Sequence, residues 1–181
     1  MGFPDWFNYE QNCTTMNKKQ ALPWDNPRFH NWIAVGRACQ VMGLALARAL
    51  APLDLKPPHL DILVNLYRTP GISQQDLADK LLVGRSNLSM LLPQLEKRGL
   101  LVRSNDPQDR RILRLELTPE GTRLTEEAIV IQSQIIDRAM KTADTDECNL
   151  VGEVMTRIIR ELTTSDAEKQ QDAGKSLQKN A

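Results

Sequence analysis

The sequence has little of what would indicate disulfides, a metal centre or export. Its 181 residues include only 3 cysteines, with no close pair among them, so neither a disulfide framework nor a CxxC zinc site is indicated. The 2 histidines belong to no cluster with metal-ligand spacing, and we expect neither a metal nor another cofactor. The first residues lack a basic segment followed by an apolar run, so we expect no secretory signal and a cytoplasmic location.

Sequence motifs of the common enzyme classes are also absent. The chain contains no GxSxG nucleophile turn, no phosphate-binding P-loop and no HExxH zinc motif. It also has no paired carboxylates with an evident partner. We therefore expect that the protein is not an enzyme.

The chain has no net charge, since 23 basic side chains balance 23 acidic ones. The balance is not local, because residues 84–114 carry seven basic and three acidic side chains, whereas the acidic excess lies after residue 114. A basic segment within a neutral protein is typical of a site for a polyanion such as nucleic acid. Charge alone equally fits a solvated surface.

One apolar stretch, residues 32–51, is long enough to span a bilayer, and its only polar side chains are Arg37, Gln40 and Arg48. Each arginine near the bilayer centre costs at least ~2.5 kcal/mol, and the stretch is rich in alanine and glycine. We therefore expect no membrane contact, and a helix over 29–51 that is buried on most of its circumference in a helical assembly.

The two ends of the chain have contrasting compositions. Residues 1–28 form an aromatic arm, which we expect to pack against the body or a second subunit. Residues 164–181 contain one large apolar side chain, Leu177, and we expect a disordered tail.

Local signals in the middle of the chain predict a helix-turn-helix. Pro57 suits the first turn of a helix whose apolar positions include Leu60, Leu63, Val64 and Tyr67. Ser73, followed by Asp76, is a helix N-cap. A tight turn at 82–84 then leads to a helix over 85–98, which Gly99 terminates. The outward positions of this second helix are small or cationic and suit base edges: Arg85, Ser86, Asn87 and Ser89.

A β-hairpin is expected after Gly99. Residues 100–102 and 112–117 have the pattern of strands, and the polar, basic segment 103–111 connects them. Thr118 and Pro119 begin a further helix, and a last helix starts near Asp144 or Thr145.

Two segments resemble the MarR family of winged helix-turn-helix regulators, namely 73–103 and, more specifically, 105–121. The second contains Asp109-Arg110-Arg111 followed by a strand and Leu117-Thr118 with Gly121. The resemblance implies a mostly helical (α+β) fold, with a winged helix-turn-helix lobe at 57–118 and a helical dimerisation region formed by 29–56 and 119–163. It further implies a homodimer on double-stranded DNA with a pseudo-palindromic operator.

The resemblance also implies roles for individual residues. Arg111 would enter the minor groove, with Asp109 fixing its direction. Ser86, Asn87 and Ser89 would contact bases or phosphates. Phosphate contacts would come from three arginines: Arg85, Arg103 and Arg110. The sequence departs from the family at Gly84, where a serine cap is usual, and at Pro93, which predicts a kink in the recognition helix.

Regulation is less determined by the sequence. The resemblance implies a sequence-specific DNA-binding transcriptional regulator, a repressor released by a small-molecule ligand, which in the family is often aromatic or phenolic. A pocket for such a ligand would have walls formed by Trp32, Arg37, His59, Leu63 and Tyr67, although ordinary core and surface positions explain these residues as well. A redox-sensing Cys39 and a winged helix used as a protein-interaction adaptor are alternatives.

Overall fold

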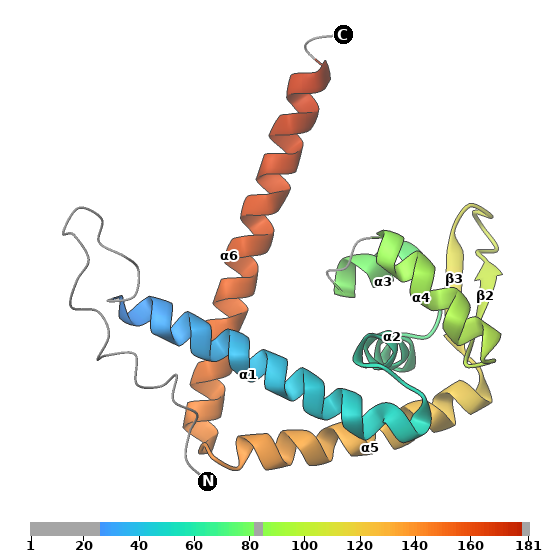
Figure 1. The fold of residues 1–181 in the computed structure, drawn as a ribbon. Coiled ribbons are helices and arrows are strands. Elements are labelled where there is room, and N and C mark those ends of the chain that lie inside the picture. Colours follow the sequence, from blue (N-terminus) through green and yellow to red (C-terminus); the bar gives the residue numbers. More distant parts are fainter. Residues whose placement is uncertain (1–25, 82–84, 179–181) are drawn as a thin grey trace. The chain divides into compact units, whose positions relative to one another are not determined.

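The computed structural model describes residues 26–81 and 85–178, and these divide into two units at Gly43 (Figure 1). The first unit contains most of α1 (Pro27–Leu50). The stretch Pro27–Leu53 meets the length and composition needed to cross a membrane, and its most apolar 18-residue window has a mean hydropathy of 1.4. Only Leu50 of α1 is buried within the single chain, and burial of most of the helix in a helical assembly stays a prediction. The aromatic arm at 1–25 lies outside the described residues.

The second unit contains the predicted helix-turn-helix. After a 3₁₀ turn (Ala51–Leu53), α2 (Pro57–Arg68), α3 (Gln74–Leu81) and α4 (Arg85–Lys97) follow in order. The N-cap of α3 is the one expected, since the backbone N–H of Asp76 donates to the Ser73 hydroxyl over 3.0 Å. The predicted apolar face of α2 was partly wrong: Ile62 and Leu66 are buried, whereas Tyr67 is exposed. The predicted turn at 82–84, with Gly84, lies outside the described residues.

A three-stranded antiparallel sheet completes this lobe, in the order β1-β3-β2. The hairpin strands are β2 (Leu101–Asn105) and β3 (Leu113–Leu117), and β2 is longer than expected because pairing with β3 continues to Asn105. The first strand, β1 (Ile72–Ser73), was not predicted. Its two residues, Ile72 and Ser73, pair with Leu115 and Arg114 of β3. The local sequence pattern does not indicate pairing between segments so far apart in the chain.

The core of the lobe is built from leucines. It joins α2, α3, α4 and the sheet around side chains with no exposed surface: Leu60, Leu63, Leu77, Leu88, Leu92, Leu95 and Leu115. Burying a leucine contributes about 1.5–3 kcal/mol, so this cluster is a major source of the lobe's stability.

The hairpin is joined to α5 (Pro119–Met140) by a tightly packed turn. The Thr118 hydroxyl donates to Gly99 O over 2.6 Å and accepts from the backbone N–H of Gly121 over 2.9 Å, so it caps α5 as expected. The backbone N–H of Thr118 donates to Leu100 O over 3.1 Å. This explains the spacing Leu-Thr-x-x-Gly, because only glycine at 121 leaves room for the Leu100 carbonyl.

The last helix is longer than expected. α6 (Thr145–Gln178) begins where predicted but continues through most of the segment expected to be a disordered tail. That segment lacks proline and is rich in alanine, glutamine and lysine, all of which have favourable helix propensity.

Candidate nucleic-acid interface

The helix predicted to read DNA has one buried and one exposed face. Leu88, Leu92 and Leu95 fix α4 to the core, while Asn87 and Ser89 are exposed. The side chains of Arg85 and Ser86, at the start of α4, lie outside the described part of the chain. The structure therefore places two of the four predicted residues of α4 on an accessible face.

The C-terminal end of α4 is held in place by its neighbours. The helix runs from Arg85 to Lys97 with Pro93 inside it. Gly99 adopts a φ of 69°, and the Leu100 N–H donates to Leu95 O over 3.0 Å, which together terminate the helix. The Arg98 guanidinium donates to Leu53 O over 3.0 Å and also to Asp54 O, so it connects α4 to the segment before α2.

At the wing tip, Asp109 holds the side chain of Arg111. The Nε of Arg111 lies 3.0 Å from Asp109 Oδ1, and Nη2 lies 2.8 Å from Oδ2, which is a bidentate pair. These bonds hold the pKa of the Asp109 carboxyl below its usual value. The Arg111 side chain is still 90% exposed. An arginine that is fixed in direction yet open to solvent suits insertion into a groove of the duplex.

The base of the wing is organised by Asp106, which the sequence analysis missed. Its carboxylate accepts from the backbone N–H of Gln108 over 2.7 Å, from that of Asp109 over 3.1 Å, and from Arg114 Nε over 2.7 Å. Arg114 also donates to Gly71 O over 3.2 Å, which ties the wing to the segment before α3. An aspartate that begins Asp-Pro-Gln-Asp is a turn signal that could have been recognised.

The wing should respond to acid through Asp106. Backbone hydrogen bonds from Gln108 and Asp109, together with Arg114, lower the pKa of Asp106. A carboxyl whose pKa is lower in the folded state stabilises the protein above its unfolded pKa of about 4, and this stabilisation is lost as pH falls through the lowered value.

We therefore expect the melting temperature of the wild type to fall between about pH 5 and pH 2 more steeply than that of Asp106→Asn. Circular dichroism melts across this range measure the difference, and Asp146→Asn in the exposed first turn of α6 is the control. Parallel pH profiles of wild type and Asp106→Asn would contradict the assignment.

The other predicted phosphate contacts differ in their surroundings. Arg103 forms an ion pair with Glu96 of α4, which raises the pKa of Arg103 and lowers that of Glu96. Arg103 therefore links β2 to α4, and its phosphate role remains a prediction. Arg110 is exposed in the wing loop beside Arg111.

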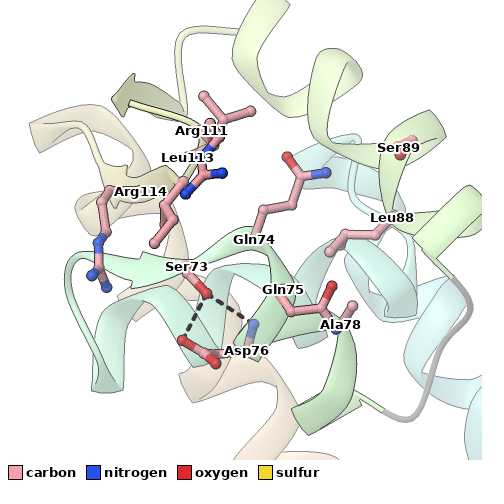
Figure 2. Close-up of a pocket in the computed structure, with 11 residues that line it drawn as sticks. Ser73, Gln74, Gln75, Asp76, Ala78, Leu88, Ser89, Arg111, Leu113 and Arg114 are labelled. Atoms are coloured by element: carbon pink, nitrogen blue, oxygen red, sulfur yellow. Dashed lines mark hydrogen bonds between the residues drawn. The ribbon is translucent and has the colours of Figure 1, made fainter. Parts of the chain in front are cut away.

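A hollow of about 570 Å³ separates α4 from the wing. Figure 2 shows the Gln74 side chain extending into it between Ser89 and Arg111. The Gln74 Oε1 is buried and has no hydrogen-bond partner among the described residues. The first turn of α3, Leu88 and Ser89 of α4, and the wing residues 111–114 therefore surround one recess.

The five residues predicted to line a ligand pocket do not line this hollow. Trp32 and Arg37 lie in the first unit, on α1, whereas the other three lie on α2. Leu63 is a fully buried core residue, and the Tyr67 hydroxyl donates to Glu126 Oε1 over 3.0 Å. His59 is buried, and this burial lowers its pKa. The ligand pocket remains a prediction.

The cysteines provide no additional support for redox sensing. Cys39 is exposed on α1 and Cys148 is half-buried on α6, while Cys13 lies outside the described residues. Exposure alone does not make a thiol reactive, because reactivity also requires an electropositive setting.

Comparisons with known proteins agree with this geometry. The sequence model that describes the MarR family matches residues 53–112 of this chain. A Thauera aromatica protein, assigned to the transcriptional regulation of the hcr operon, is 33% identical over 119 residues, covering 64% of this chain and 70% of that protein.

Solved structures show the same architecture. The transcriptional repressor CouR, bound to a 23-mer DNA duplex, is 29% identical with a TM-score of 0.66, over 70% of this chain and 89% of CouR. AbsC, a MarR family transcriptional regulator from Streptomyces coelicolor, is 22% identical with a TM-score of 0.74, over 80% of this chain and 99% of AbsC. With its helix-turn-helix, its wing and its Leu-Thr-x-x-Gly junction, the chain belongs to the MarR family of transcriptional regulators.

Proposed function

We propose that the protein binds double-stranded DNA as a homodimer and represses transcription from the promoter it occupies. The observation that carries the proposal is the recess described above, with α4 on one side and the oriented, 90% exposed Arg111 on the other. A helix reaches base edges in the major groove, and a guanidinium is attracted to the negative potential of a narrow minor groove. The two elements together fit adjacent grooves of one duplex.

A second copy of the chain accounts for the exposed apolar surface outside the lobe. Large apolar side chains are exposed on α1, α5 and α6: Trp32, Val41, Met42, Val130, Ile136, Leu150, Val151, Ile159 and Leu162. Soluble proteins rarely expose so much apolar surface without covering it. We assign these helices, at 29–56 and 119–163, to the dimer interface, and 57–118 to DNA binding.

Twofold symmetry sets the form of the operator. A dimer presents two copies of α4, and two half-sites about 34 Å apart place both copies on the same face of the duplex. The operator would then be pseudo-palindromic. Repression follows by exclusion of the polymerase from the occupied promoter, and CouR, which is named a repressor, supports this sign of regulation. Release by a small aromatic ligand remains the prediction from sequence.

Salt dependence distinguishes DNA binding from the alternative of a protein-interaction adaptor. We expect affinity for the intergenic DNA upstream of the chain's own gene to fall steeply with salt, since each neutralised phosphate releases counterions. Mobility shifts between 50 and 200 mM salt should show a loss of at least about tenfold. A duplex of scrambled sequence is the control for specificity. A flat salt profile would contradict the proposal and favour the adaptor.

A further inference from the structure

Met90 is the most exposed large hydrophobic side chain in the part of the chain that the structure describes, with 68% of its surface accessible. It lies on α4, on the side opposite Leu88 and Leu92, which have no exposed surface. Exposure of this flexible, unbranched apolar side chain to water is not favourable, and the side chain is available to contact a binding partner. The proposed function places this face of α4 in the major groove.

The middle of α4 has no positive charge. Between Arg85 and Lys97 the only ionisable side chain is Glu96, which is paired with Arg103. This part of the helix therefore has no guanidinium for the two acceptors of guanine and no cation for a phosphate. Its readout depends on neutral polar and apolar side chains.

Two such side chains lie next to each other. Asn87 is exposed and precedes Met90 by three residues, so the two are neighbours on the helix surface. Gln94, one turn after Met90, is tied back to the helix because its Nε2 donates to Met90 O over 2.9 Å. Asparagine pairs with the N6 and N7 positions of adenine, and apolar side chains contact the C5-methyl group of thymine.

We propose that Met90 contacts the C5-methyl group of a thymine in the major groove, beside an adenine bound by Asn87. The α4 helix is then a reader of A·T pairs, and thymine methyl groups are part of its specificity. This inference rests on the proposed function and adds the base class that the reading helix selects.

Removal of single methyl groups from DNA tests the proposal. The full chain first selects duplexes from a random-sequence library, and each thymine of the selected duplex is then replaced by deoxyuridine in both half-sites. We expect one symmetric pair of thymines at which the wild type loses about 15-fold in affinity, since burying one methyl group is worth about fourfold in each of the two half-sites.

Protein variants, each measured on the thymine and the uracil duplex, test whether Met90 is the side chain that contacts the methyl group. Met90→Ala should bind the thymine duplex about as weakly as the wild type binds the uracil duplex, and should no longer distinguish the two. Met90→Leu should retain the discrimination. Val102→Ala, which trims another exposed apolar side chain on β2, should behave as the wild type. Because Met90 is exposed, these substitutions test contact with DNA rather than folding.

Several outcomes would overturn the proposal. These are a selected half-site with only G·C pairs under α4, a wild type indifferent to every thymine methyl group, or a Met90→Ala protein that still distinguishes thymine from uracil. A change in dimer formation that fully explains the Met90→Ala defect would also overturn it. If no duplex is enriched, the proposed function fails as well. If a duplex is enriched and Arg111→Ala weakens its binding, the proposed function stands, and the outcomes above then reject only the contact between Met90 and thymine.

Discussion

Arg111→Ala is expected to weaken operator binding by about 1–3 kcal/mol for each wing that contacts the duplex. The substitution removes a guanidinium that is 90% exposed and held by two hydrogen bonds to Asp109. The wild type has already oriented this side chain, so little conformational entropy is lost on binding. Fluorescence anisotropy with a labelled operator at fixed salt measures the change.

Two further variants separate charge from orientation at the wing. Asp109→Asn keeps the arginine but weakens its support, and we expect a smaller loss of affinity than for Arg111→Ala. Arg123→Ala is the matched control, because Arg123 is also an exposed arginine paired with acidic side chains, but on α5. An unchanged dissociation constant for Arg111→Ala would contradict the proposed role of the wing.

Gly121→Ala is expected to destabilise the fold by more than about 3 kcal/mol. A Cβ at this position would lie 1.8 Å from Leu100 O and 2.8 Å from Leu100 C. The clash is with backbone, and that backbone is constrained because Leu100 O accepts from Thr118 N and the Thr118 hydroxyl caps α5. Relief therefore requires α5 and the hairpin to separate.

Chemical denaturation followed by circular dichroism measures this loss, with both proteins at the same concentration because dimerisation contributes to stability. Gly152→Ala is the control, since it adds the same methyl group within α6, where nothing lies within 4 Å. That variant should be as stable as the wild type or slightly more so, because alanine is a better helix former than glycine. Equal stability of Gly121→Ala and the wild type would show that the junction is not close-packed.

The elements predicted from the sequence are those whose boundaries are marked by motifs of a few neighbouring residues. Ser73 with Asp76, Gly99, and Thr118 with Pro119 mark helix boundaries that the structure confirms within one or two residues. The contact between Asp109 and Arg111, which the resemblance implied, is present and needs only a local turn, whereas its role on DNA stays a prediction.

Contacts between distant residues could not be predicted in the same way. The two residues of β1 are a strand only because β3, about 40 residues later, pairs with them. Arg114 reaches both Asp106 and Gly71 O, and Arg103 reaches Glu96, so two arginines of the basic segment support the lobe. The basic composition of the segment did not distinguish Arg103 and Arg114 from the solvent-exposed Arg111.

The sequence by itself determined the order of the helices, their caps and the presence of a wing, because these depend on dihedral preferences and hydrogen bonds within short segments. The family followed from the resemblance of two segments to known regulators. The tertiary structure decided which basic side chains are engaged within the lobe and which are exposed to solvent, why residue 121 is glycine, and that Met90 is exposed in the middle of the reading helix. These depend on which distant segments meet when the leucine core closes, and short-range preferences carry no information about that.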